Sequence, residues 1–160
     1  MILGLSTGLF TGLHVVLSLI GILSGFLLLG LLTGKKRHTV WTPIFFLSNI
    51  LTDVTGFLFP FKGITPGIIL GVLSLIALLV AGLTSASRTK RGIFVAAAAT
   101  ALFFNVFVLI VQSFEKIDFL HHLAPAQNSP VFLITQAIGL GIIILLAVSA
   151  WGRYRKAGIS

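Results

Sequence analysis

Residues 8–37, GLFTGLHVVLSLIGILSGFLLLGLLTGKKR, form an almost unbroken apolar run of helical length that ends in three basic residues. About 20 consecutive apolar residues are enough for a helix to cross the hydrocarbon core of a bilayer. Similar runs follow at about 42–61, 66–84, 92–114 and 130–151. With the first helix at about 8–33, the sequence predicts an all-α integral membrane bundle of five transmembrane helices, in a single transmembrane domain over residues 1–160.

The composition agrees with a lipid environment. Of the 160 residues, 57% are hydrophobic and only 9% are charged, against roughly 25% charged residues in a soluble domain. In lipid the backbone must satisfy its own hydrogen bonds, which leaves helices or a closed barrel. Barrel strands alternate polar and apolar residues over about 10 positions, and these longer runs do not alternate. The absence of cysteine excludes disulfides, thiolate catalysis and cysteine-based metal sites.

Basic residues mark one side of the predicted membrane. All but two of the 11 lysines and arginines fall in the loops after the first and third helices or in the C-terminal tail, and the exceptions are Lys62 and Lys116. Short loops rich in Lys and Arg stay in the cytoplasm. We therefore expect the N-terminus outside and the C-terminus in the cytoplasm. The net charge of +8 then indicates orientation and contact with anionic headgroups, and we predict no nucleic-acid partner.

Three of the predicted helices begin with the same kind of residue pair. Thr42-Pro43, Thr65-Pro66 and Ser129-Pro130 each place a hydroxyl at the N-cap and a proline at the first helical position. These pairs predict that the second and third helices are separate and joined by a tight turn at 62–64, although the apolar run there is nearly continuous.

Small residues predict where the first helix packs. His14, Ser18, Gly21 and Gly25 step by 4, 3 and 4 positions and therefore share one helix face. Small residues allow the backbones of two membrane helices to approach closely. We expect this face to meet another helix, within one bundle or across a homodimer.

Polar residues inside the apolar runs are candidates for binding a ligand or a proton. At 1.5 Å per residue, His14, Asp53, Asn105 and Gln136 lie roughly 9–13 Å below the predicted outer boundary, on four different helices. Each shares a helix face with small or polar residues, so each is expected to point toward another helix. The full set of candidates is His14, Asn49, Asp53, Asn105, Gln112 and Gln136.

Asp53 is the most informative of these candidates. A carboxylate at this depth costs several kcal/mol unless it is paired or protonated, and intramembrane acids are often functional. In one interpretation Asp53 binds a proton or a ligand. In the other it is a hydrogen-bonded residue that ties the second helix to His14, Asn105 or Gln136. The residues alone leave both interpretations open.

The histidines raise two further hypotheses. His14 is one potential axial ligand of a haem, but a second would have to come from His121 or His122 in the outer loop. If the fourth helix continues beyond its apolar run, Glu115, Asp118 and His122 share a face, and such oxygen and imidazole ligands could hold a divalent metal. An ordinary solvated loop explains the same residues, and we predict no haem or metal cofactor.

Three segments carry a resemblance to a known kind of protein. TGFLFP at 55–60, NVFVLIVQSF at 105–114 and LHHLAPAQ at 120–127 resemble segments of an uncharacterised family of small bacterial multi-pass inner-membrane proteins. The resemblance covers most of the chain. It implies a location in the bacterial inner membrane, and it carries over no catalytic residue.

The sequence contains no nucleophile motif, phosphate-binding loop or nucleotide fingerprint. We therefore predict a non-enzymatic membrane component that binds lipid or a partner, either a second copy of the chain or another membrane subunit. A small transporter or proton-linked channel that uses the polar layer around Asp53 is the alternative. A haem or metal redox subunit is the second alternative.

Overall fold

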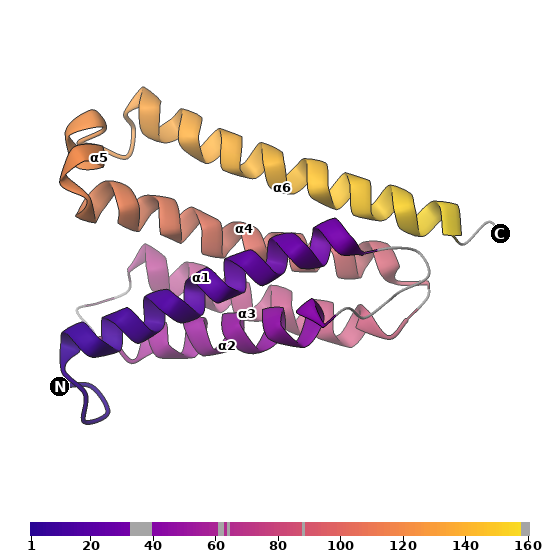
Figure 1. The fold of residues 1–160 in the computed structure, drawn as a ribbon, viewed down its shortest axis with the longest axis horizontal. Helices are drawn as coiled ribbons and strands as arrows, with labels where there is room; N and C mark the ends of the chain where they lie inside the picture. Colours follow the sequence, from indigo (N-terminus) through magenta and orange to yellow (C-terminus); the bar gives the residue numbers. More distant parts are fainter. Residues whose placement is uncertain (33–39, 61–62, 64, 88, 158–160) are drawn as a thin grey trace.

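The computed structural model describes residues 1–32, 40–60, 63, 65–87 and 89–157, and this part of the chain is helical and contains no strand. The predicted all-α class is confirmed for these residues. The elements, shown in Figure 1, are α1 (Thr7–Leu31), α2 (Trp41–Phe57), α3 (Pro66–Ser85), α4 (Arg91–Lys116), α5 (Asp118–Leu123) and α6 (Pro130–Ala157).

In the described part of the chain, four helices are long and apolar enough to cross a membrane. They are α1, α3, α4 and the Pro130–Arg155 part of α6, and each contains an 18-residue window with a mean hydropathy between 2.3 and 2.6. Their outward faces carry large apolar side chains, such as Leu79, which is 61% exposed, and Leu145, which is 69% exposed. Continuous apolar surface of this kind is unfavourable in water and suits lipid. These features indicate a multi-pass membrane protein. Helix α2, with 17 residues, is shorter than any of these four helices.

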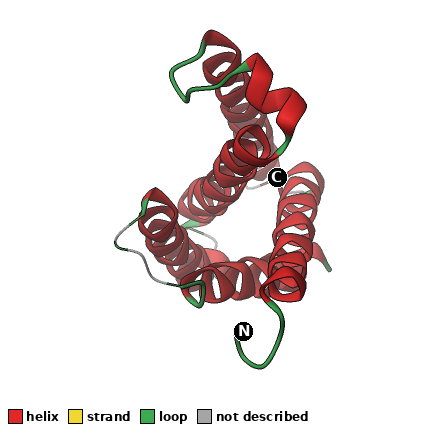
Figure 2. Cartoon of the chain, turned by 90° about the vertical axis from the view of Figure 1, so that its left-hand side faces the viewer, coloured by secondary structure: helices red, strands yellow, loops and turns green. Residues whose placement is uncertain are grey.

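Helices α1 to α4 form a four-helix bundle. Each helix packs against the next along the chain, α4 packs against α1, and α6 lies outside along α4 and reaches α1. Figure 2 shows this arrangement viewed along the helices. We call the end that holds the N-terminus and α5 the α5 end, and the opposite end the C-terminal end (Figure 1).

Two predicted helix ends differ from the structure by more than two residues. The predicted helix at 42–61 ends at Phe57, because Pro60 disfavours a helical conformation in the residue before it. The predicted helix at 130–151 continues to Ala157. Its last turns contain Arg153 and Arg155, and arginine is a good helix former that interacts favourably with the carboxyl end of a helix.

The predicted helix caps have mixed outcomes. Thr65 caps α3 as predicted, because its hydroxyl accepts a hydrogen bond from the Ile68 backbone N–H at 3.4 Å. The prediction for Thr42 is wrong: α2 begins at Trp41, so Thr42 lies in its first turn, and its buried Oγ1 has no partner among the described residues. The Ser129 hydroxyl accepts from a backbone N–H of the preceding turn instead.

The bundle toward the C-terminal end has a tightly packed apolar core. Leu28, Phe45 and Leu102 are fully buried there, on three different helices. The small polar residues of this region bond to their own helices, as when Ser24 and Ser48 donate to carbonyls one turn earlier. The hydroxyl groups of Ser24 and Ser48 are therefore already in use within their own helices.

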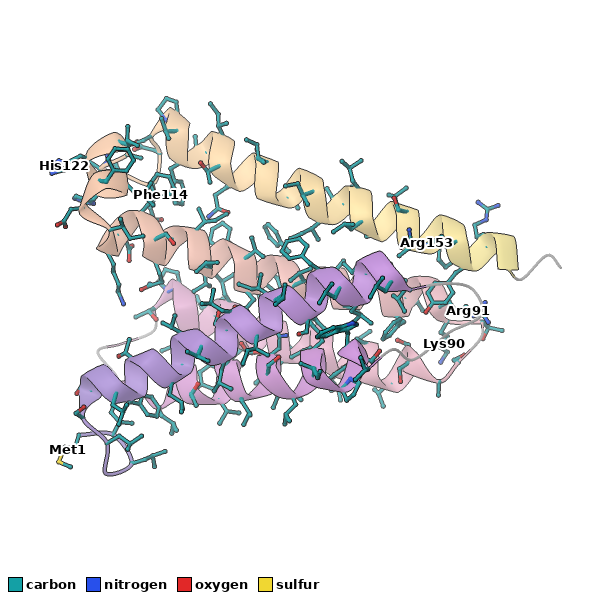
Figure 3. The ribbon with its side chains drawn as sticks, in the orientation of Figure 1. Met1, Lys90, Arg91, Phe114, His122 and Arg153 are labelled. Atoms are coloured by element: carbon teal, nitrogen blue, oxygen red, sulfur yellow. The ribbon has the colours of Figure 1, made fainter. Side chains whose placement is uncertain are left out.

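Arg153 joins the end of α6 to the end of α1. Its guanidinium group donates to the carbonyl oxygens of Leu32 and Leu29, both at 2.7 Å, and to that of Gly30 at 3.2 Å. These are backbone acceptors at the carboxyl end of α1, which the helix itself leaves unpaired. Figure 3 shows Arg153 near the end of α6, at the C-terminal end of the molecule. The side chain thus caps the first helix from the last one.

Candidate functional site

A cavity of about 530 Å³ lies between α1, α2, α3 and α4, toward the α5 end of the bundle. Its polar lining includes His14, Asp53, Ser74, Asn105, Gln112 and Lys116. Aromatic side chains that form part of its apolar wall are Phe57, Phe59 and Phe104. The volume falls within the range of about 300–1,000 Å³ that is typical of small-molecule sites.

Two asparagines beside this cavity belong to a continuous chain of hydrogen bonds. Ser18 Oγ donates to Asn105 Oδ1 at 2.6 Å, and Asn105 Nδ2 donates to Asn49 Oδ1 at 2.8 Å. Asn49 Nδ2 in turn donates to the backbone carbonyl of Phe45 at 2.7 Å. A Cβ atom at Gly21 would lie 2.9 Å from Asn49 Nδ2, so the glycine makes room for the pair. Asn49 and Asn105 therefore tie α1, α2 and α4 together.

His14 is oriented by a different hydrogen bond. Its Nδ1 lies 2.9 Å from Thr55 Oγ1, and the same hydroxyl donates its proton to the carbonyl of Leu51 at 2.7 Å. When the hydroxyl proton is on the Leu51 carbonyl, Thr55 accepts from His14, and the proton of a neutral imidazole is then assigned to Nδ1 with Nε2 as an acceptor. The ring of Phe59 packs edge-on against the imidazole at 5.3 Å between centroids and helps to fix its orientation.

Asp53 faces α3 and the cavity. The Ser74 side chain lies near its carboxyl group, and a Cβ atom at Gly71 would lie 3.9 Å from Oδ1. The other oxygen, Oδ2, is buried and has no partner among the described residues. Asp53 shares the cavity with His14 and Asn105, but each of those side chains hydrogen-bonds elsewhere. The carboxyl group therefore retains an unused acceptor.

The two glutamines of the candidate set occupy different sites. Gln112 lines the cavity, one to two turns from the end of α4. Gln136 does not line it, because α6 lies outside the four-helix bundle. Its Nε2 donates to the carbonyl of Phe107 at 3.3 Å, and its buried Oε1 has no partner in the described part of the chain. Of the four residues predicted to lie at the same depth, His14, Asp53 and Asn105 thus line one cavity, and Gln136 does not.

The helix that the metal hypothesis requires is interrupted. Helix α4 ends at Lys116, Ile117 adopts an extended conformation (φ −98°, ψ 110°), and α5 begins at Asp118. Glu115 and His122 therefore belong to different helices, so the condition under which they would share one helix face with Asp118 is not met.

The break has a physical cause. Because the helix ends at Lys116, α5 and the following loop fold back, and Ala124 joins Phe114 and Phe132 in a small apolar cluster. Leu120 packs against this cluster, whose burial favours the break.

The remaining polar groups at the α5 end form no metal site in the part of the chain that is described. Glu115 accepts a hydrogen bond from Gln127 Nε2 at 3.1 Å. No set of three histidine, aspartate or glutamate side chains within the described ranges is placed to hold a metal ion. His121 and His122 lie on the exposed α5 and do not line the cavity of His14 (Figure 3 labels His122).

Three site residues were absent from the candidates predicted from sequence. Thr55 orients His14, Ser74 faces Asp53, and Lys116 lines the cavity at the end of α4. Ser74 follows Gly71 by three positions on α3, and this small face marks the side that α2 approaches. Thr55 offers no such pattern, because threonine in a helix commonly bonds only to its own backbone.

The geometry separates two kinds of polar residue. Asn49 and Asn105 are satisfied by one another and by neighbouring groups, whereas Asp53 and His14 keep acceptors that the described chain does not use. No family model, curated protein or solved structure matches the chain. The interpretation therefore rests on the cavity and its lining.

Proposed function

We propose that this protein is a non-enzymatic membrane component that binds a small amphipathic molecule, a lipid or a lipid-like compound, in the cavity between α1 and α4. The observation that carries the proposal is the two-part lining. Asp53 and His14 provide polar groups, and Phe57 and Phe104 contribute to an apolar wall. A molecule with a polar head and an apolar body complements such a lining, since ligand sites typically combine apolar walls with a few placed polar groups.

The packed layer below the cavity favours binding over transport. Leu28, Phe45 and Leu102 fill the bundle between the cavity and the C-terminal end. A transporter or channel would need a second arrangement that opens this layer. The proton-linked alternative is favoured by one observation: Asp53, which lines the cavity, has a buried Oδ2 without a partner among the described residues.

We propose further that the chain crosses a bacterial inner membrane five times, with the N-terminus outside. At 1.5 Å per residue the 17 residues of α2 span roughly 26 Å, close to the hydrocarbon thickness of about 30 Å. Helix α2 also runs beside α1 and α3, which are both long enough to cross. The charge asymmetry between the loops supports this orientation. The cavity would then lie in the outer half of the bilayer.

Cysteine labelling tests the orientation, because the native chain has no cysteine. In intact cells, a membrane-impermeant maleimide should label Asn128→Cys, at an exposed position between α5 and α6. It should label Ser160→Cys only after the cells are permeabilised. Labelling of Ser160→Cys but not of Asn128→Cys in intact cells would mean the opposite orientation, and equal labelling of both would mean that α6 does not cross the membrane.

A cavity-filling substitution tests the binding function. Val108 lines the cavity, so Val108→Trp should exclude the ligand. Val148 on α6 is 63% exposed and does not line the cavity, so Val148→Trp is the matched control. Mass spectrometry of small molecules that copurify in mild detergent should find a species retained by the native protein and by Val148→Trp. We expect Val108→Trp to lose it by at least about tenfold, the effect of about 1.4 kcal/mol in binding.

Identical copurifying molecules in all three proteins would contradict the proposed site. Proton flux in reconstituted vesicles that Asp53→Asn abolishes would favour the proton-linked alternative instead.

A further inference from the structure

We propose that the ligand is an amphiphile with an anionic head group, a carboxylate or a phosphate, which binds Lys116 and Gln112 while its apolar chain extends inward along α4. The head group then lies at the mouth of the cavity, the part that faces the α5 end. This inference rests on the proposed binding function and specifies the class of ligand and its direction in the site.

One stripe of α4 lines the cavity from its inner part to its mouth. Four residues follow one another along this stripe at intervals of four and all line the cavity: Phe104, Val108, Gln112 and Lys116. Side chains four apart lie on the same helix face, with roughly 5–6 Å between their Cβ atoms. The two inner residues are apolar and the two outer residues carry hydrogen-bond donors. The stripe therefore has the polarity of an amphiphile.

The donors of the two outer residues are accessible and unused. Gln112 is partly buried and Lys116 is exposed, and neither side chain forms a hydrogen bond or an ion pair with another described residue. Because both side chains are long and lie one helical turn apart, an amide N–H and an ammonium can reach one head group. An anionic oxygen accepts from both, and hydrogen bonds to an ionised group are the strong ones.

The charge at the mouth favours an anion. Lys116 is the only lysine or arginine among the described residues that line the cavity, and it lies close enough to His14 to interact with it electrostatically. Its acidic neighbours in the sequence, Glu115 and Asp118, do not line the cavity, and Glu115 accepts a hydrogen bond from Gln127. The described lining therefore offers the ammonium no carboxylate partner at the mouth.

Asp53, the one acid in the described lining, lies deeper in the bundle. The hydrogen bond between Asn105 and Asn49 fixes the relative level of α2 and α4, which run in the same direction (Figure 1). Asp53 lies four residues beyond Asn49, and Lys116 lies eleven residues beyond Asn105, so Lys116 is roughly 10 Å closer to the α5 end at about 1.5 Å per residue. At this separation the two side chains form no ion pair.

The amino end of α3 adds to the preference for an anion. Helix α3 begins and α4 ends at the α5 end (Figure 1), and Thr65, Gly67 and Ile68 line the cavity. The first N–H groups of a helix carry partial positive charge. This charge and that of Lys116 favour the same kind of head group.

Four probes of equal chain length test the head group: decanoate, decyl phosphate, decanol and decyltrimethylammonium. Binding is measured by calorimetry with the full-length protein in nanodiscs of zwitterionic lipid, and empty nanodiscs give the correction for partitioning into the bilayer. We expect decanoate or decyl phosphate to bind at least about tenfold more tightly than decanol and the cation, because hydrogen bonds to charged groups exceed neutral ones in strength.

Substitutions of lysine test the residue that binds the head group. Lys116→Gln should weaken the binding of the anionic probes at least about tenfold and leave that of decanol unchanged. Lys116→Arg keeps the charge and should keep the preference. Lys90→Gln is the matched control, because it removes the same charge from an exposed lysine at the opposite end of the molecule (Figure 3). Thermal unfolding of each variant confirms that it is folded.

Each result decides the proposal. Tighter binding of decanoate than of decyl phosphate indicates a carboxylate head, and the reverse indicates a phosphate head. If decanol binds as tightly as both anions and Val108→Trp blocks all three, the anionic-head proposal is wrong while the binding function stands. The same conclusion follows if the cation binds most tightly, or if Lys90→Gln weakens the anions as much as Lys116→Gln does. If Val108→Trp changes the binding of no probe, both proposals are wrong.

Discussion

Gly21→Leu is expected to lower the free energy of unfolding by about 3 kcal/mol, since overpacking costs about 1–3 kcal/mol and each buried polar group left unpaired costs about as much. A Cβ atom at this position would lie 2.9 Å from Asn49 Nδ2 and 3.2 Å from Asn105 Nδ2. A leucine must therefore displace the asparagine pair that joins α2 to α4. Gly25→Leu should act similarly, because its Cβ would lie 2.8 Å from Leu102 Cδ1.

Gly12→Leu is the matched control. It lies on the same helix, and a Cβ atom there would meet nothing within 4 Å. Unfolding in mixed micelles, followed by circular dichroism, measures the three variants under one condition. Equal stability of Gly21→Leu and Gly12→Leu would show that close packing of Gly21 against α2 and α4 does not contribute to stability.

Arg153→Met is expected to cost about 2–3 kcal/mol, the range for hydrogen bonds to a charged group. The substitution removes three hydrogen bonds to the end of α1 while it keeps a long side chain that suits a helix. Arg153→Lys should lie between the native protein and Arg153→Met, because it retains the charge but loses the planar fork.

Arg155→Met provides the control for charge and position. Arg155 lies two residues further along α6 and is exposed, so its substitution should change stability by no more than about 0.5 kcal/mol. The same micelle unfolding assay applies. A loss of stability at Arg155 equal to that at Arg153 would mean that net charge at this end matters and that the bonds to α1 do not.

The helices were predictable because their signals are local. Each apolar run is long, and pairs such as Thr65-Pro66 mark a helix start independently of hydropathy. The helix face of Gly21 was also predictable, since residues four apart lie on one side of a helix whatever surrounds it. These features depend on the spacing of residues along the chain and need no knowledge of its neighbours.

Which residues line the cavity was harder to predict, because this depends on how the helices are arranged around one another. Depth alone placed Gln136 in the polar layer, but depth does not reveal that α6 packs outside the bundle. The metal-binding face likewise assumed that α4 continues past Lys116, whereas the apolar cluster around Phe114 favours a turn. Asp53 is conspicuous in the sequence as an acid inside an apolar run, but the position of Ser74 beside it depends on the packing of α3.

The bonds from Arg153 also bear on how the protein is made. The guanidinium reaches Leu32 across 121 positions of the chain, from the last helix to the first. At a synthesis rate of about 5–20 residues per second, roughly 6–24 seconds separate the translation of these two residues. Throughout that interval the last carbonyls of α1 must be hydrated or held by other groups. Helix α1 is therefore capped only after α6 has been synthesised, when the four helices of the bundle have already been made.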